Sequence, residues 1–280
     1  MSGTLYIVGT PIGNLGDFSQ RAKEILDSVD FIAAEDTRVT IKLLNKFNLK
    51  KPLISYHEHS TSQRASQIIA RLLDGENAAI VSDAGMPCIS DPGEKLVKVC
   101  AENNIETTVI PGPNAAICAL CLSGLNTSRF AFYGFLSTNR KSRIETLLEL
   151  KNLPLTLIFY EAPHKLISTL KDLLNFLGDR KISIVKELTK MHENVLRTTI
   201  SSAVDFFVKS AKNPKGEYVL IVEGAENVEN LEVKSTLDEA LNFAKGLINQ
   251  GFRAVDAAKQ AAKITNHKKS EIYNLLLTEK

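Results

Sequence analysis

Long apolar segments are missing from the sequence. No run approaches the 18 or more residues that a membrane-spanning helix needs, and residues 2–17 are interrupted by proline and glycine, unlike the apolar core of a signal peptide. We therefore expect a cytoplasmic protein without a membrane partner. With 280 residues, 44% of them apolar, the chain is long enough for one large domain or two ordinary ones.

Cysteine is also scarce, and its spacing does not indicate a metal site. Among the four cysteines, Cys118 and Cys121 form a C-x-x-C pair. Zinc would need a second ligand pair, and this pair lies in an apolar helical pattern rather than after a strand, as a redox dithiol would. We predict that both pack in the core. His57 and His59 share a strand face but have no third ligand at a useful spacing, so we predict no metal.

An excess of one charge is missing as well, since 34 Lys and Arg are balanced by 32 Asp and Glu. The net charge of +2 does not by itself indicate a nucleic-acid partner. Positive charge is concentrated at the C-terminus, where residues 245–280 hold seven Lys and Arg and three Asp and Glu. Such a segment fits either a contact with an acidic partner or a packing or dimerisation element.

The first part of the chain alternates short β-rich runs with helical patterns. This alternation is typical of βαβ units and predicts a parallel sheet, whose functional loops follow the carboxyl ends of the strands. The predicted strands are residues 5–9, 31–35, 52–57, 78–83 and 107–110, and the loops are residues 10–17, 36–38, 57–60, 84–93 and 111–114.

The second part has predicted strands at 130–136, 156–161, 181–188, 195–200 and 217–223. The strands at 181–188 and 195–200 are joined by only a short polar connection, which predicts a mixed sheet. An acidic, Asn-rich segment follows, and then helical patterns at 237–250, 254–264 and 270–277. The predicted organisation is an α/β domain over 1–112, a second α/β domain over 113–224 with a ligand cleft between them, a linker over 225–236 and a basic helical extension over 237–280.

Two glycine-containing loops are candidates for ligand binding. Residues 5–17, LYIVGTPIGNLGD, run from a strand into a loop where the backbone allows close approach, but they match neither G-x-G-x-x-G nor a P-loop. A simple turn with positive φ is the alternative there. Residues 82–93, SDAGMPCISDPG, are longer than a plain turn. Asp83 could accept ribose hydroxyls, whereas Asp91 could instead cap the helix that starts near Glu94.

Charged residues follow two other predicted strands. In the segment 35–38, Asp36 or Thr37 could serve only as a helix cap, while Arg38 could hold a phosphate or pair with Glu35. The segment 160–165, YEAPHK, places an acid, an imidazole and a cation at the end of a strand of the second part. Both segments are expected to face the cleft.

Eight segments together resemble, in order and spacing, the signatures of the ribosomal RNA small-subunit methyltransferase I family, a branch of the tetrapyrrole methylase superfamily. They are LYIVGTPIGNLGD, AAEDTR, SYHEH, SDAGMPCISDPG, VIPGPNA, FYEAPHK, KELTKMHEN and GEYVLIVEG. The resemblance runs over residues 5–224, and the basic tail is similar to the family's C-terminal extension. It implies S-adenosylmethionine bound between two α/β domains, a homodimer, and methylation of the ribose 2′-oxygen of a decoding-centre cytidine in 16S rRNA of the small ribosomal subunit.

The resemblance also implies, position by position, which residues bind the cofactor. These are Gly9, Pro11, Ile12, Gly13, Asp83, Gly85, Met86, Pro87, Asn114, Ala115, Tyr160 and Glu217. The chain departs from the family's usual residues with Lys165 and Lys186 in place of arginine, Asn194 in place of glutamate and Ser60 in place of asparagine. Lysine cannot reproduce the bidentate fork of arginine at a phosphate or carboxylate clamp.

A ribose hydroxyl needs a base or cation nearby to handle its proton. The candidates are Glu35, Asp36, Arg38, His57, Glu161 and His164. Our first choices are Glu161 as proton acceptor and Arg38 as the group that holds the RNA backbone, because each follows a strand that should end at the cleft. A structural ion pair between these two across the domain interface is the alternative.

The basic tail is the predicted RNA contact, through Arg253, Lys259, Lys263, Lys268 and Lys269. Two rival functions are methylation of a corrinoid or of a modified protein histidine, and RNA binding by a non-catalytic ribosome-assembly factor. The basic tail and AAEDTR argue against the first, and the intact loop at 82–93 argues against the second.

Overall fold

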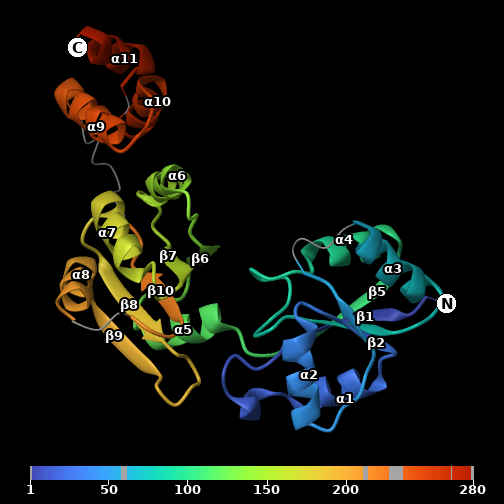
Figure 1. The fold of residues 1–280 in the computed structure, drawn as a ribbon. Helices are drawn as coiled ribbons and strands as arrows, with labels where there is room; N and C mark the ends of the chain where they lie inside the picture. Colours follow the sequence, from blue (N-terminus) through green and yellow to red (C-terminus); the bar gives the residue numbers. More distant parts are fainter. Residues whose placement is uncertain (1, 58–61, 211–213, 227–235, 266, 279–280) are drawn as a thin grey trace.

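The computed structural model describes residues 2–57, 62–210, 214–226, 236–265 and 267–278. Two α/β domains lie side by side, and three further helices follow the second domain at the C-terminal end (Figure 1). The predicted fold class is confirmed, with a parallel first sheet, a mixed second sheet and a helical C-terminal part.

The first domain has a five-stranded parallel sheet in the order β3-β2-β4-β1-β5. Its central strands are buried on both faces, as the continuous apolar runs FIAA and AAIV require. Helices α1 and α2 cover one face, and α3 and α4 cover the other (Figure 1). The elements are β1 Thr4–Val8, a 3-10 turn Leu15–Asp17, α1 Gln20–Ser28, β2 Phe31–Ala34, α2 Thr37–Lys46, β3 Leu53–Ser55, α3 Ser62–Leu73, β4 Ala78–Val81, α4 Glu94–Glu102 and β5 Glu106–Ile110.

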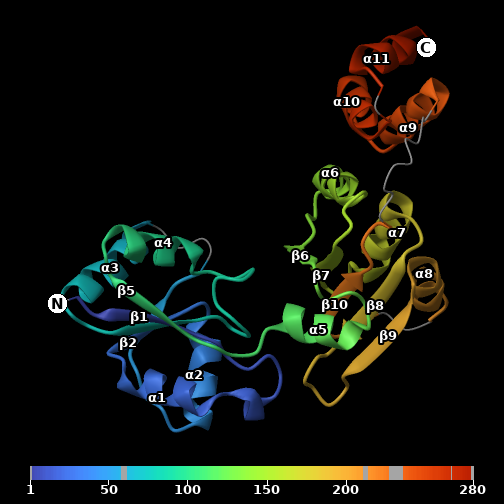
Figure 2. The same ribbon diagram turned by 180° about the vertical axis from the view of Figure 1, so that it is seen from behind.

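The second domain has a sheet in the order β6-β7-β10-β8-β9, in which only the β6–β7 pairing is parallel. Helix α5 packs on one face of this sheet, next to the crossing from the first domain, and α7 and α8 pack on the other (Figure 2). The elements are α5 Ala115–Ser123, β6 Phe130–Phe135, α6 Arg140–Leu150, β7 Thr156–Glu161, α7 Leu166–Leu177, β8 Lys181–Lys186, β9 Asn194–Thr199, α8 Ile200–Lys209 and β10 Tyr218–Val222.

The C-terminal helices α9 Leu237–Asn249, α10 Ala254–Thr265 and α11 Lys269–Thr278 attach to α6. Lys141 forms an ion pair with Asp256 at 3.3 Å and lies over the ring of Phe252, and Lys263 lies 3.5 Å from Glu149. Buried residues of these helices belong to the same apolar cluster as the core under α6 and α7. None of the helices within the described residues is long and apolar enough to cross a membrane.

One prediction about packing is wrong. Cys121 is exposed, although it was expected in the core, whereas Cys118 is half-buried and packs against the apolar cluster between α5 and the second sheet. Helix α5 is apolar on all sides, so the sequence pattern does not mark its buried face, which contains Ala116, Ala119 and Leu120. Cys121 lies on the opposite side.

Candidate active site

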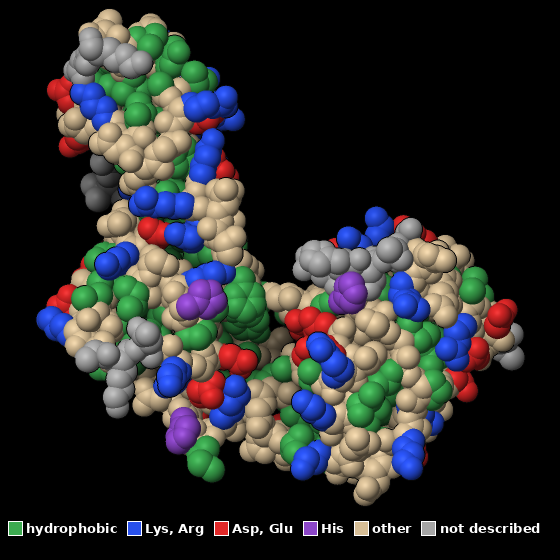
Figure 3. All heavy atoms as spheres, viewed as in Figure 1, with side chains coloured by type: hydrophobic (Ala, Val, Ile, Leu, Met, Phe, Trp, Pro, Cys, Tyr) green, Lys and Arg blue, Asp and Glu red, His purple; other side chains and the backbone are tan. Residues whose placement is uncertain are grey.

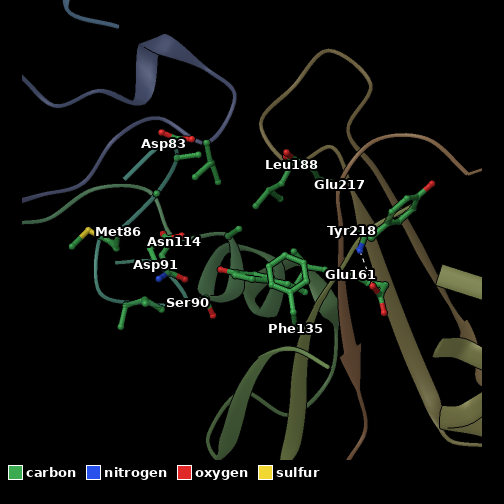
Figure 4. A pocket seen from close by; sticks show the side chains of 18 of the residues that line it. Asp83, Met86, Ser90, Asp91, Asn114, Phe135, Glu161, Leu188, Glu217 and Tyr218 are labelled. Carbon is green, nitrogen blue, oxygen red and sulfur yellow. Dashed lines mark hydrogen bonds between the residues drawn. The ribbon is translucent and has the colours of Figure 1, made fainter. Parts of the chain in front are cut away.

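A cavity of about 440 Å³ lies between the two domains, and we call it the interdomain cavity. Figure 4 shows its two walls, with Asp83, Met86, Ser90 and Asp91 on one side and Phe135, Leu188, Glu217 and Tyr218 on the other. Acidic side chains gather on both rims of the hollow between the domains (Figure 3). The two sets of strand-end loops are thus brought together, as the parallel topology predicts.

The first wall is built by the loops after β1 and β4, which are joined by their backbones. The Thr10 N–H donates to the Gly85 carbonyl at 2.9 Å, and the Gly85 N–H donates to the Thr10 carbonyl at 3.1 Å. Gly85 has φ +89°, and a Cβ there would lie 3.3 Å from Cγ2 of Ile12. Glycine is therefore required where the two loops meet. Ile12, Gly85 and Met86 line the cavity.

Gly9 supports this wall from behind rather than lining it. A Cβ at Gly9 would lie 2.7 Å from both the Cα of Gly112 and the sulfur of Met86. The end of β1 can therefore approach Gly112 and Met86 this closely only because Gly9 has no side chain.

Asp83 ties together the ends of β2 and β4. Its carboxylate accepts a hydrogen bond from the Asp36 N–H at 3.1 Å, and its own N–H donates to the Glu35 carboxylate at 3.1 Å. Burial raises the pKa of Asp83 above its ordinary value, while the hydrogen bond from Asp36 opposes that rise. Asp83 and Glu35 both line the cavity.

Asp91 also lines the cavity, which the sequence did not reveal. Helix α4 begins at Glu94 with Gly93 as its N-cap and no side-chain cap, so the suggested capping role of Asp91 is wrong. Burial, followed by the charge of Glu35, raises the pKa of Asp91 to about 6, against the hydrogen bond from Ser82. A carboxylate with a pKa this close to neutrality in a cleft is a candidate functional group.

The second wall begins where the chain enters α5. Asn114 caps this helix by accepting a hydrogen bond from the Ile117 N–H at 3.1 Å, and the Tyr160 hydroxyl accepts one from the Ala116 N–H at 3.2 Å. Glu217 is exposed, and its carboxylate forms an ion pair with the Lys190 ammonium at 2.9 Å. Asn114, Ala115, Tyr160 and Glu217 all line the cavity.

Several predicted cofactor residues lie elsewhere. Pro11 and Gly13 line a separate cavity of about 380 Å³ against α2, with Asp83 on the wall that it shares with the interdomain cavity. Pro87 is not among the residues that line the interdomain cavity. The cofactor roles predicted for these three residues therefore have no support from the cavity.

Arg38 does not reach the interdomain cavity. Its guanidinium pairs with Asp36 at 2.6 Å and its side chain is 86% exposed. Asp36 also accepts a hydrogen bond from the Arg38 N–H and so caps α2, the simpler of its two predicted roles. The hydrogen bond from the Arg38 guanidinium, followed by the one from the Arg38 N–H, lowers the pKa of Asp36 to about 2. The predicted ion pair between Arg38 and Glu161 is not formed.

Glu161 is held inside the second domain. It is 4% exposed, and its carboxylate accepts hydrogen bonds from the Ala162 N–H at 2.8 Å and from the Thr169 hydroxyl. In Figure 4 the carboxylate points away from the opposite wall. Although the residue borders the cavity, this engagement argues against its predicted role as proton acceptor. His164 is not among the lining residues, and His57 lines a second cavity behind Asp91.

The predicted RNA-contacting residues differ in their availability. Arg253 pairs with Asp256 at 2.9 Å, and Lys263 lies 3.5 Å from Glu149. Within the described part of the chain, Lys259, Lys268 and Lys269 are exposed and form no ion pair. The described residues contain no group of three or more His, Cys, Asp or Glu arranged to hold a metal ion.

Comparison with known proteins agrees with this architecture. The model of the family Tetrapyrrole (Corrin/Porphyrin) Methylases matches residues 4–204. Similar folds occur in a diphthine synthase (TM-score 0.59, 12% identity, covering 80% of this chain and 90% of that one) and in the methyltransferase CobJ (TM-score 0.59, 15% identity, covering 80% and 95%).

Curated relatives are far more similar in sequence. Proteins named ribosomal RNA small subunit methyltransferase I match from Synechocystis sp., at 46% identity over 98% of both chains, and from Halalkalibacterium halodurans, at 47% over 98% of this chain and 94% of that one. A relative of the same name from Thermotoga maritima, 46% identical, matches over its whole length but covers only 80% of this chain. The chain therefore belongs to the tetrapyrrole (corrin/porphyrin) methylase family and, within it, to the ribosomal RNA small subunit methyltransferase I family.

Proposed function

We propose that the protein transfers a methyl group from S-adenosylmethionine to the ribose 2′-oxygen of a decoding-centre cytidine in 16S rRNA of the small ribosomal subunit. The observation that carries the proposal is the 46% identity to a ribosomal RNA small subunit methyltransferase I over 98% of both chains. Distant structural likenesses to enzymes with other substrates concern the fold alone.

S-adenosylmethionine is the methyl donor of this family, and the interdomain cavity suits it. A volume of about 440 Å³ is in the range of small-molecule sites, and apolar side chains such as Ile12, Met86 and Leu188 alternate with polar groups around it. The carboxylates of Glu35, Asp83 and Asp91 give the first wall a negative potential that favours a cationic ligand. When bound, the cofactor supplies a methyl group on a positively charged sulfur.

We assign Asp83 to the ribose hydroxyls of the cofactor and Ile12, Gly85, Met86, Asn114 and Ala115 to the walls around it. The loops after β1 and β4, which carry Ile12, Asp83, Gly85 and Met86, are joined by backbone hydrogen bonds between Thr10 and Gly85, which favours a preformed wall. The chain's main contribution would be alignment of the two reactants with water excluded, because methyl transfer is an in-line displacement.

The C-terminal helices would add affinity for RNA rather than chemistry. A relative with the same name aligns over its whole length with 80% of this chain, an alignment of 224 residues, which is about the length of the two α/β domains. The exposed lysines of α10 and α11 are then accessory contacts to the RNA backbone. A homodimer, implied by the family resemblance, stays a prediction.

The test is methyl transfer from labelled S-adenosylmethionine to small subunits purified from cells in which the gene is deleted. We expect one methyl group per subunit at a cytidine whose 3′ linkage resists alkaline hydrolysis, since a 2′-O-methyl group blocks that cleavage. Large subunits serve as the control. Transfer to a corrinoid or tetrapyrrole but not to subunits would support the rival enzyme, and subunit binding without any transfer would support an assembly factor.

A further inference from the structure

A second cavity of about 350 Å³ lies behind the loop after β4, and we call it the polar cavity. It shares three lining residues with the interdomain cavity, namely Glu35, Ser90 and Asp91. The two cavities are therefore adjacent and meet along these three residues, which we call the shared wall. The family resemblance assigned no role to the polar cavity.

The shared wall has an unusual backbone. Cys88 and Ser90 have φ values of +72° and +63°, which side-chain-bearing residues rarely adopt. The loop is held by a hydrogen bond from the Cys88 N–H to the Pro92 carbonyl at 3.3 Å. Ser90 also reaches the second domain, because a Cβ at Gly134 of β6 would lie 2.5 Å from its hydroxyl oxygen. Strain of this kind persists where the surroundings fix it, often at ligand sites.

The lining of the polar cavity fits a nucleoside better than a phosphate. Glu35, Asp91 and Glu94 supply carboxylates, which accept hydrogen bonds from ribose hydroxyls and from the exocyclic amino group of cytosine and which repel phosphate. Tyr56 adds an aromatic side chain. Lys95, the lysine among the lining residues, is exposed, so a phosphate of the RNA backbone could reach it.

We propose that the polar cavity receives the target nucleoside, turned out of the RNA, and that Asp91 on the shared wall accepts the proton of its 2′-hydroxyl. This inference rests on the proposed function. The bond between the 2′-oxygen and the methyl carbon forms as the carbon–sulfur bond breaks, and the electron pair of that bond stays on sulfur. The hydroxyl proton passes to the Asp91 carboxylate and from there to water.

Position and chemistry both favour Asp91 for this step. It lines both cavities, whereas Glu161 lines the interdomain cavity alone and Arg38 lines neither. Its raised pKa of about 6 leaves it ionised at neutral pH while making it a stronger base than an ordinary aspartate. The titratable groups that surround it are Glu35, His57, Asp83, Cys88, Glu94, Lys95 and Tyr160.

The first test compares Asp91→Asn with the full-length wild type and with Asp205→Asn, an exposed aspartate of α8 remote from both cavities. Single-turnover rates with saturating small subunits are measured from pH 5 to 8.5. We expect Asp91→Asn to be about 10²- to 10⁴-fold slower than the wild type. The wild-type rate should fall as the pH drops below about 6, whereas the rate of the variant should not show this fall. Calorimetric affinity for S-adenosylmethionine is measured in parallel and the rates are compared at saturating cofactor, because Asp91→Asn also removes one of the carboxylates that favour a cationic ligand.

The second test addresses the cavity without altering the proton acceptor. Lys95→Met removes the cation at the rim, and Lys98→Met is the matched control one turn further along α4, where the lysine faces Glu102. We expect Lys95→Met to weaken equilibrium binding of small subunits about threefold to tenfold, as expected for loss of one phosphate contact, with cofactor affinity unchanged. Lys98→Met should bind like the wild type.

The outcomes separate the two proposals. A wild type that does not methylate subunits would overturn the proposed function and the nucleoside site with it. If the wild type methylates subunits but Asp91→Asn has the same rate and the same fall in rate below pH 6, Asp91 is not the proton acceptor. Equal subunit binding by Lys95→Met and Lys98→Met would overturn the placement of the nucleoside in the polar cavity.

Discussion

The carboxylate of Glu161, the last residue of β7, accepts a hydrogen bond from the hydroxyl of Thr169 in the first turns of α7. Both side chains are buried, and the second carboxylate oxygen accepts the Ala162 N–H. The pair therefore fixes the turn between strand and helix, and its hydrogen bonds argue against Glu161 as the group that takes a proton from substrate. Its contribution should be to stability.

We expect Glu161→Ala and Thr169→Val each to lower the free energy of unfolding by about 1–3 kcal/mol, because each leaves a buried polar group without its partner. Urea denaturation of both single variants and the double variant measures this. The double variant should lose about 1 kcal/mol less than the sum of the two, since the same interaction is removed twice. Strict additivity would show that the two residues do not act as a pair.

Asp83→Ala should weaken S-adenosylmethionine binding by about 1.5–3 kcal/mol, roughly tenfold to a hundredfold in Kd, through loss of a charge-assisted hydrogen bond. Titration calorimetry on the folded variant measures the change. Because Asp83 also accepts the Asp36 N–H, thermal unfolding is followed in parallel. Asp205→Ala is the control, and unchanged affinity in a folded Asp83→Ala protein would remove Asp83 from the cofactor site.

The stability of the protein should depend on Asp91 in a predictable direction. Its pKa is about 6 in the folded chain against an ordinary value of 3.8, so the folded state binds more protons than the unfolded state between these values. The contribution of Asp91 to the free energy of unfolding therefore falls as the pH rises from about 3.8 to about 6. Asp91→Asn removes the cost of burying the charged carboxylate, so the Tm of this variant should exceed that of the wild type at pH 8.

The Tm difference between Asp91→Asn and the wild type should shrink as the pH falls towards 4, where the wild-type carboxyl is protonated. Thermal unfolding at several pH values measures the trend, with Asp205→Asn as the control. A Tm difference that stays constant from pH 4 to 8 would mean that the Asp91 carboxyl titrates as it does in the unfolded chain.

Replacing Lys259, Lys268 and Lys269 together by alanine should weaken the binding of small subunits and reduce the salt dependence of that binding. Each phosphate contact contributes about 0.7 to 0.9 to the slope of log K against log salt, so the slope should fall by about 2. A triple replacement of Lys98, Lys181 and Lys209, exposed lysines outside the C-terminal helices, is the control. Equal slopes for the two triple variants would show that the tail does not contact RNA.

Much of the fold could be predicted because its signals are local. The strands of the first sheet are short apolar runs separated by helical patterns, and the predicted strands match β1 to β5 closely. The short polar connection between β8 and β9 correctly indicated a mixed sheet, in which these two strands pair antiparallel. The face of α5 could not be predicted, since an apolar helix without a polar side gives no periodic signal.

The site was less accessible to sequence reasoning because it depends on side-chain partners far apart in the chain. The positions of Asp83, Gly85 and Met86 at the cavity follow from the parallel topology. By contrast, nothing local indicates that Thr169 engages Glu161, or that Gly93 rather than Asp91 caps α4.

The paired backbone hydrogen bonds between Thr10 and Gly85 have a mechanical consequence. They join the loops after β1 and β4, so we expect these loops to move together and to keep Ile12 and Met86 at a fixed separation when a ligand enters. The opposite side of the interdomain cavity is carried by different elements, reached through the crossing between β5 and α5. We therefore expect widening for cofactor entry or product exit to come from movement of the second domain about that crossing.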